Sequence, residues 1–174
     1  DAELAEAEDI WPAIERATKQ ALTALVNMRE REGAHLARDL AKRIGIMRKC
    51  VARVQAQAPK AAERYRQQLV ERIKSAGLTA PAPDDERLLK EVVFFADRSD
   101  ISEELTRLQS HFQQFEDCRK SAEPVGRLLD FLAQEMNREV NTIGSKADGP
   151  GVSELVVDAK AELERIREQV QNVE

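Results

Sequence analysis

The sequence is poor in the residues that build β-sheets and tight turns. Aromatic residues make up only 4% of its 174 residues, and it contains 7 glycines and 6 prolines, whereas charged residues make up 34%. Sheets favour aromatic and β-branched side chains and need frequent turns, so this composition argues against a sheet protein. It predicts an all-α fold, and the length allows one compact domain or two small helical ones.

Signals for a membrane or an oxidising compartment are also missing. No run of about 18 apolar residues is present, so no membrane span is expected. The opening residues DAE resemble neither the basic nor the apolar part of a secretory signal. Cys50 and Cys118 lie far apart and form no CxxC pair, which predicts reduced packing thiols. We therefore expect a cytoplasmic protein with no membrane partner and, because no initiator methionine opens the chain, a piece of a longer one.

The net charge of −5 conceals a strongly basic block. Residues 29–74 hold 13 Lys and Arg against 5 Asp and Glu, a balance of +8 that leaves −13 for the remainder. Such a block can bind nucleic acid, because Lys and Arg neutralise phosphates whatever the base sequence. It can equally dock on the acidic remainder of the chain. The sequence leaves these two interpretations open.

Residues 1–77 show helical periodicity almost throughout, and we interpret them as an arm region of long helices. Pro12 suits a first helical turn, and Gly33 loosens the chain between two apolar rows. Pro59 is expected to stop or kink a helix, and Gly77 to end the next one in a left-handed cap. Two antiparallel arms are expected. Their apolar rows are Ile14, Ala17, Ala21, Leu25, Met28; Leu36, Leu40, Ile44, Met47, Val51, Val54, Ala58; and Tyr65, Leu69, Ile73.

A linker at residues 78–85, LTAPAPDD, separates the arms from residues 86–174. The second region is predicted to be a C-terminal antiparallel helical bundle with coiled-coil-like seams, or an oligomeric coiled coil, because each apolar row needs a partner. The rows are Leu88, Leu89, Val92, Phe95, Ala96; Ile101, Leu105, Leu108, Phe112, Phe115; Val125, Leu129, Leu132, Met136, Val140, Ile143; and Val152, Val156, Ala159, Leu163, Ile166, Val170, Val173.

The ends of these bundle helices carry capping signals. An Asp of the linker is available to cap the first helix, and Ser99 or Ser102 the second. Pro124 is expected to begin the third helix. A loop from Gly144 to Gly151 should follow, with Ser153 as the cap of the last helix.

The helix from Pro124, PVGRLLDFLAQEMNREVNTIGSKA, carries more polar variety than a solvent-facing helix needs. Its spacing gives an amide stripe and, beside it, a second stripe of carboxylates and Arg. Asn and Thr are poor helix formers, so a mid-helix position brings no local gain. The stripes suit an oxygen-liking divalent ion or, alternatively, a solvated or interhelical hydrogen-bonding face. They comprise Asp130, Gln134, Asn137, Asn141, and Glu135, Arg138, Glu139, Thr142.

The preceding helix places Glu104, Arg107 and His111 on one face, with Asp100 at its start. Phosphodiester hydrolysis needs such residues: a divalent ion or a general base to activate water, and a cation to offset phosphoryl charge. A lone His is also common as a capping or packing residue. His35, among Ala and Arg residues, is interpreted as a surface residue.

Three segments carry a family resemblance: ADRSDISEELTRLQSHFQQF, then PVGRLLDFLAQEMNREVNTIGSKA, then ELVVDAKAELERIREQVQNVE. They resemble the C-terminal region of the bacterial YicC/YloC proteins, and the likeness extends into ALTALVNMREREGAHL. It implies an endoribonuclease that cuts single-stranded RNA with a divalent cation, Mn²⁺ or Mg²⁺. It also implies homo-oligomers, hexamers in the family, and an N-terminal domain that precedes this segment.

The resemblance carries over two sets of polar positions, to which we assign roles as a chemical hypothesis. The positions are Asp97, Arg98, Asp100, Glu103, Glu104, Arg107, Ser110, His111, and Arg127, Asp130, Gln134, Glu135, Asn137, Arg138, Glu139, Asn141, Thr142, Ser145, Lys146. The expected catalytic residues are His111, Glu104, Glu135 and Arg138. The expected RNA-binding residues are Arg107, Arg127, Asn137, Asn141 and Lys146. The expected metal ligands are Glu104, His111, Glu135 and Glu139.

Two functional hypotheses follow. In the first, the chain is the helical part of a metal-dependent endoribonuclease and holds its reactive residues, while the basic arms guide RNA. In the second, it is an oligomerisation and RNA-binding scaffold, and catalysis depends on the N-terminal domain. A plain coiled-coil adaptor without nucleic acid ranks last, because an adaptor has no use for His and amides against carboxylates.

Overall fold

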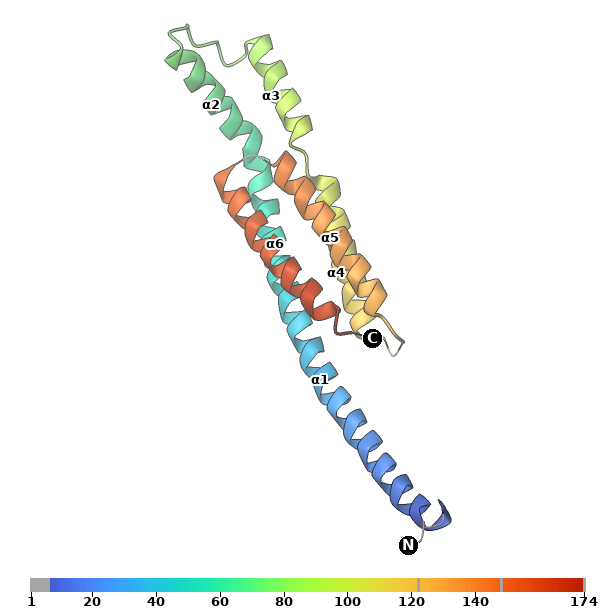
Figure 1. The fold of residues 1–174 in the computed structure, drawn as a ribbon. Helices are drawn as coiled ribbons and strands as arrows, with labels where there is room; N and C mark the ends of the chain where they lie inside the picture. Colours follow the sequence, from blue (N-terminus) through green and yellow to red (C-terminus); the bar gives the residue numbers. More distant parts are fainter. Residues whose placement is uncertain (1–6, 122, 148, 174) are drawn as a thin grey trace. The chain divides into compact units, whose positions relative to one another are not determined.

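The computed structural model describes residues 7–121, 123–147 and 149–173, and within them it contains helices and no strand. This confirms the all-α prediction. None of the helices in this part of the chain has the length and apolar character that a bilayer crossing requires. The elements are α1 (Ala7–Gln57), η1 (Ala58–Lys60), α2 (Ala61–Ser75), α3 (Glu86–Arg98), α4 (Ser102–Arg119), α5 (Gly126–Lys146) and α6 (Pro150–Val170) (Figure 1).

The chain divides into two compact units, Asp1–Asp39 and Leu40–Glu174. The described part of the first unit is helix alone, the N-terminal part of α1. Large apolar side chains lie exposed along it, among them Ile10, Trp11, Ile14, Leu22, Leu25, Val26 and Met28. Short-range pairs such as Lys19 with Glu15 support this helix along its surface.

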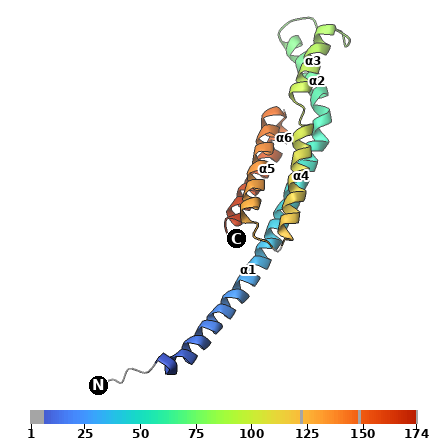
Figure 2. The same cartoon turned by 90° about the vertical axis from the view of Figure 1, so that its right-hand side faces the viewer.

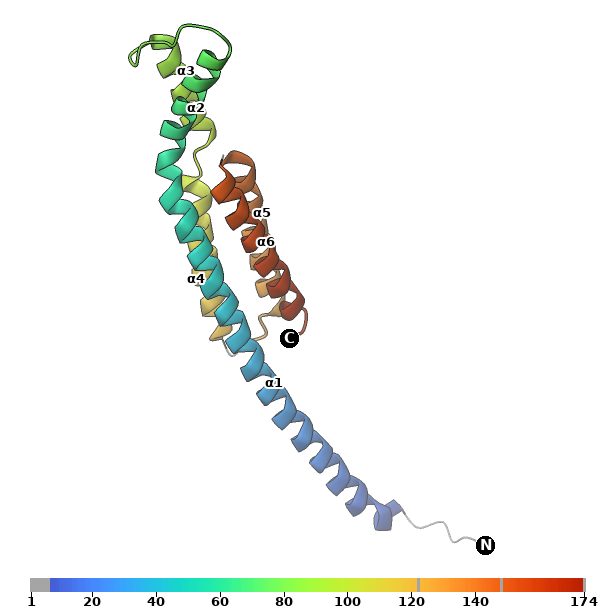
Figure 3. The ribbon, with the colours of Figure 1, turned by 90° about the vertical axis from the view of Figure 1, so that its left-hand side faces the viewer.

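The core of the second unit lies between the C-terminal part of α1, α4, α5 and α6. α5 packs against both α4 and α6, as Figures 2 and 3 show. The predicted rows of α4, α5 and α6 and the row from Leu40 to Val54 enter this core, whereas the predicted row Ile14, Ala17, Ala21, Leu25, Met28 stays exposed. The core's most deeply buried large side chains are Ile44, Met47, Leu108, Phe112, Phe115, Leu129, Leu132, Met136, Leu155, Leu163, Ile166 and Val170.

α2 and α3 form a smaller pair within the same unit. The rings of Tyr65 and Phe95 stack with their centroids 3.9 Å apart, and the Tyr65 hydroxyl donates a hydrogen bond of 3.0 Å to Glu91. α2 therefore packs against α3, across the linker at residues 78–85, which contains no helix. The proposed division at this linker stays a prediction.

Three predicted helix signals are confirmed. α1 ends at Gln57, and Pro59 lies in the single 3₁₀ turn that follows. Gly77 adopts a φ of 75°, the left-handed conformation that only glycine enters without strain. Asp85 caps α3, since its carboxylate accepts hydrogen bonds from the backbone amides of Arg87 and Leu88.

The expected cap of α4 was wrong. Ser102 is the first residue of α4, and Ser99 lies at the C-terminal end of α3. Asp100 takes the capping role: its Oδ1 accepts hydrogen bonds from the backbone amide and the hydroxyl of Ser102. A carboxylate satisfies a helix N-terminus as a serine does and adds a favourable charge.

Other expected boundaries also differ. α1 continues as one helix through Gly33, because a single glycine costs only about 1 kcal/mol. α5 begins at Gly126 rather than Pro124. It runs to Lys146, and α6 starts at Pro150, so the loop expected from Gly144 to Gly151 is shorter. Proline fits a first helical turn, so α6 starts at Pro150, ahead of the expected cap Ser153. The Ser153 hydroxyl instead donates a hydrogen bond to the Gly149 carbonyl.

Phe112 and Phe94 offer a matched test of the core. Phe112 is 0% exposed and Phe94 61% exposed. We expect Phe112→Ala to lower the free energy of unfolding by about 3–5 kcal/mol, because it removes buried contacts and leaves a cavity. Phe94→Ala should change it by about 0.5 kcal/mol or less. Urea denaturation followed by circular dichroism measures both, and equal losses would contradict the assigned core.

Candidate functional site

Two ion pairs cross the interface between α4 and α5. Lys146 Nζ lies 2.7 Å from Glu104 Oε1, and Arg107 Nη1 lies 3.4 Å from Glu139 Oε1. Both carboxylates are buried, Glu104 at 4% and Glu139 at 6% exposure, whereas both cations reach solvent. We call these four residues the α4–α5 spine.

Local sequence places these groups beside the apolar seam. Glu104 and Arg107 stand three residues apart on α4, and Glu139 and Lys146 stand seven apart on α5, so each pair shares a helix face. Burying a carboxylate alone is costly, so it needs a cation and hydrogen bonds to remain charged. The antiparallel helices meet this need by facing each carboxylate with a cation of the other helix.

The spine shifts the acid–base behaviour of its members. Burial acts to raise the pKa of Glu104, but the hydrogen bond from Lys146, a hydrogen bond from its own backbone amide and the charges of Lys146 and Arg107 outweigh it. The pKa of Glu104 therefore lies below its ordinary value, and the bond to Glu104 raises the pKa of Lys146. Both groups are held in their charged forms.

The amide and carboxylate stripes of α5 mainly pair within the helix. Asn141 donates to Asn137 over 2.8 Å, and Gln134 donates to Asp130 over 2.7 Å. Glu135 pairs with Arg138, three residues on. These bonds lie within α5 and not between helices, so they correspond to the solvated alternative for these stripes, and Arg138 and Arg127 are exposed.

His111 is half-buried on α4. The register set by the two ion pairs places it opposite the α5 turn from Glu135 to Glu139. Its Nδ1 is buried without a hydrogen-bond partner. If Nε2 were to act as a general base, the imidazole proton would sit on this unpartnered Nδ1, at a cost of about 1–3 kcal/mol. In the Nε2–H form the same Nδ1 is an unpartnered acceptor, so both neutral forms carry such a cost, and the role of His111 as base stays a prediction.

The four expected metal ligands do not converge. Glu104 and His111 are seven residues apart, about 10 Å along the helix axis, and Glu139 faces Arg107 between them. Among the residues that the structure describes, no three His, Cys, Asp or Glu side chains gather in a group that could hold a metal ion. Glu104, with one carboxylate oxygen buried and unpartnered, is the member best prepared for a further contact. As a four-ligand set within this chain, the residues do not fit one ion.

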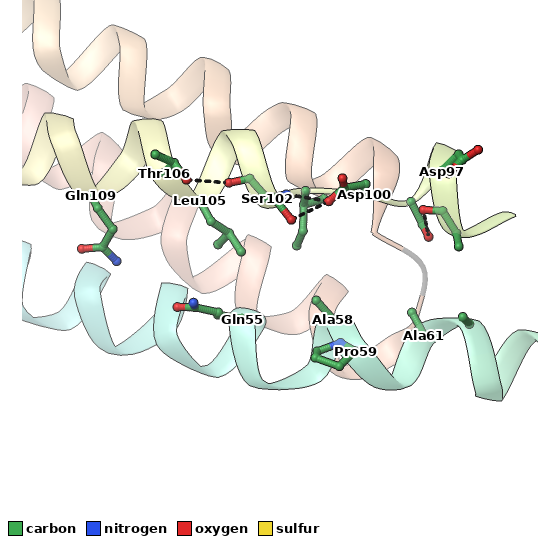
Figure 4. A pocket seen from close by; sticks show the side chains of 14 residues that line it. Gln55, Ala58, Pro59, Ala61, Asp97, Asp100, Ser102, Leu105, Thr106 and Gln109 are labelled. Carbon is green, nitrogen blue, oxygen red and sulfur yellow. Dashed lines mark hydrogen bonds between the residues drawn. The ribbon is translucent and has the colours of Figure 1, made fainter. Parts of the chain in front are cut away.

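Sequence reasoning missed a cleft of about 680 Å³ between the end of α1 and the α3–α4 junction (Figure 4). Alanines and Pro59 form much of its wall, and its polar groups come from Gln55, Asp97, Ser99, Asp100, Ser102, Thr106 and Gln109. No Lys or Arg lines it, so it suits hydrogen-bond donors better than phosphate. The motif ADRSDIS, residues 96–102, supplies one wall of the cleft. Gln55 on the other wall lies about 40 residues away in sequence, so no local pattern connects it with this motif.

Comparison with known proteins shows which family the helices of these sites belong to. A family model described as "Endoribonuclease YicC-like, C-terminal" matches residues 54–174, which include α4, α5 and the spine. The chain belongs to the YicC-like family. The resemblance read from the sequence motifs is thereby confirmed.

Two curated relatives extend the match toward the N-terminus. The chain is 41% identical over 170 residues, 97% of its length, to "Probable endoribonuclease YicC" of Clostridioides difficile (strain 630). It is 36% identical over 153 residues, 88% of its length, to the protein of the same name from Haemophilus influenzae (strain ATCC 51907 / DSM 11121 / KW20 / Rd). The matches cover 58% and 52% of these relatives, so the chain spans little more than half of their length.

The lowered pKa of Glu104 predicts a pH-dependent contribution to stability. A carboxylate whose pKa is depressed by folding stabilises the protein above its unfolded pKa and loses this contribution as pH falls through the folded value. The free energy of unfolding should therefore fall more steeply in the wild type than in Glu104→Gln as pH drops below about 4.3. Urea titrations at several pH values measure this difference, and parallel curves would contradict it.

Proposed function

We propose that this chain is the helical C-terminal part of a metal-dependent endoribonuclease that cleaves single-stranded RNA by phosphodiester hydrolysis. The observation that carries the proposal is the family match over residues 54–174, together with two relatives named as probable endoribonucleases. The complete protein is proposed to act in the cytoplasm as a homo-oligomer. The exposed apolar side chains of the first unit support assembly, because such a row is more stable when covered.

The geometry of the spine supports contact with RNA. Lys146 and Arg107 keep 38% and 53% of their side chains exposed although each is anchored to a buried carboxylate. An anchored cation is already oriented when a phosphate arrives, and it can offset charge that builds on the phosphoryl oxygens. Arg138, Arg127, Asn137 and Asn141 on α5 extend the proposed contact surface.

The proposed cofactor is a divalent cation, Mn²⁺ or Mg²⁺. When bound, such an ion supplies activated water and stabilises negative charge on phosphate. Glu104, Glu135, Glu139 and His111 do not form one coordination group in this chain, so we assign them no joint ligation. Their proposed roles are to hold the spine cations in place and to accept or orient protons near α5.

The scaffold hypothesis is the second candidate. It is favoured by the pairing of all four spine charges, and of Glu135 with Arg138, within the fold, which gives these charges a structural use without RNA chemistry. It is also favoured by the length of the relatives, since a further part of the protein remains to supply catalytic groups. In that case this chain binds RNA and assembles the enzyme, while catalysis depends on the other part.

Substitutions at Glu135 and Glu164 distinguish the two hypotheses. Each Glu pairs with an Arg three residues on, Glu135 with Arg138 and Glu164 with Arg167. If Glu135 takes part in catalysis, Glu135→Gln in the full-length protein should lower cleavage of a single-stranded RNA about 10²-fold. Glu164→Gln should leave cleavage unchanged, since it removes the same kind of pair away from the spine.

RNA affinity and oligomer size complete the Glu135 test. Under the catalytic hypothesis both stay unchanged in Glu135→Gln while cleavage falls. Under the scaffold hypothesis the substitution alters binding or assembly. Cleavage by Glu135→Gln at the wild-type rate would remove this residue from the catalytic set.

Metal dependence has its own test. We expect full-length protein treated with a chelator and then dialysed to lose RNA cleavage, and added Mn²⁺ or Mg²⁺ to restore it, because the proposed reaction needs the ion to activate water. Cleavage in labelled single-stranded RNA is measured against the ion concentration. Undiminished cleavage by the metal-free protein would contradict the proposed cofactor.

A further inference from the structure

A row of exposed cations follows the outer face of α1 within the second unit. Lys42, Lys49 and Arg53 are spaced by seven and four residues, which places them within about 40° around the helix. Lys60 extends the row into η1 and is also exposed. We call these four residues the α1 cationic stripe.

The stripe points away from the core of its unit. The buried residues of the same stretch are Leu40, Ile44, Met47, Cys50, Val51 and Val54. At about 100° per residue, this apolar row centres on nearly the opposite side of the helix. The stripe is therefore not covered by the bundle that α1 helps to build.

The stripe also lacks the ion pairs that other surface cations form. Elsewhere on the surface, Lys19, Lys74, Lys90 and Arg167 each pair with a Glu three or four residues away. In the described ranges, no hydrogen bond or ion pair is formed by the side chains of the stripe. No Asp or Glu lies between Lys42 and Lys60. Asp39 and Glu63 lie three residues beyond the two ends of the stripe, and Glu63 pairs with Arg66.

The remaining cations of this stretch serve the bundle instead. Arg43 reaches buried Glu162 on α6 over 3.2 Å, and Arg48 lies over the Phe112 ring of α4 at 5.2 Å. The basic block thus divides by direction. Between residues 42 and 60, Arg43 and Arg48 contact the rest of the unit, as one interpretation of the sequence held, whereas the cations of the stripe form no ion pair within the described part of the chain.

We propose that the α1 cationic stripe binds the phosphate backbone of single-stranded RNA. The stripe extends over 18 residues, about 27 Å of helix, which is long enough to contact several successive phosphates. Exposed, unpaired Lys and Arg bind a polyanion without reading its bases and release counterions as they do so. The choice of RNA as the polyanion rests on the proposed function, whose reactive residues lie on other helices.

The salt dependence of RNA binding tests the stripe. The full-length protein is compared with its Lys42→Gln/Lys49→Gln/Arg53→Gln/Lys60→Gln variant, using a short, fluorescently labelled 2′-O-methyl RNA that resists cleavage. The slope of log K against log salt concentration is about −0.7 per phosphate contact for single strands. Loss of four contacts should therefore make the slope shallower by about 3, and affinity at low salt should fall.

A second variant controls for net charge. Lys19→Gln/Lys74→Gln/Lys90→Gln/Arg167→Gln removes the same total charge from cations that are paired on other surfaces. Its slope should change by less than about 1. Gln keeps helix propensity close to that of Lys and Arg, and circular dichroism verifies that both variants remain folded.

The outcomes separate this inference from the proposed function. A slope that stays the same in the stripe variant, or that changes equally in both variants, overturns the stripe as an RNA-binding surface. Cleavage of unmodified RNA by the wild type is measured in parallel. A shallower slope without any wild-type cleavage supports the stripe and contradicts the endoribonuclease. Cleavage by the wild type, together with an unchanged slope in the stripe variant, supports the endoribonuclease and contradicts the stripe.

Discussion

The second unit depends on one electrostatic constraint: a carboxylate can be buried between helices only where a cation of another helix reaches it. Glu104 and Glu139 meet this condition between α4 and α5, and Glu162 meets it between α6 and α1 through Arg43. Apolar seams tolerate sliding by a heptad, because similar side chains return every seven residues. The ion pairs tolerate no such shift, since it would leave charges buried alone. The ion pairs therefore select one helix register among those that the apolar seams allow.

The same pairing restricts what the spine can do chemically. Lys146 and Arg107 each form an ion pair with a buried carboxylate across the helix interface, and their side chains remain partly exposed. A phosphate can therefore approach them without unfolding of the helices. Their positive charge is largely balanced by Glu103, Glu104 and Glu139. Long-range attraction of RNA must come from charges that are not balanced, and the outer face of α1 holds such charges. In this proposal the spine cations of α4 and α5 position the RNA phosphate, and the cations of α1 attract the RNA.

Helix content, the buried rows of the bundle helices and the effects of Pro59, Gly77 and Asp85 could be predicted from sequence, because they depend on local backbone chemistry and periodicity. The exact helix starts could not. Ser99 and Ser102 both suit a cap by residue type, yet Asp100 accepts the hydrogen bond from the backbone amide of Ser102. Cross-helix partners were also beyond sequence reasoning: Glu104 and His111 share a face of α4, yet their use depends on what α5 places opposite each. The amide stripe was read as anomalous, whereas Asn137 and Asn141 bond to each other.

The distribution of the two large chromophores has a practical consequence for spectroscopy. The chain contains one tryptophan and one tyrosine. Trp11 is 63% exposed on the helix of the first unit, whereas Tyr65 stacks on Phe95 in the second. Tryptophan fluorescence should therefore change little when the bundle unfolds, whereas tyrosine absorbance reports on the α2–α3 pair. Transitions followed by these two signals have no reason to coincide, even when each unit unfolds cooperatively.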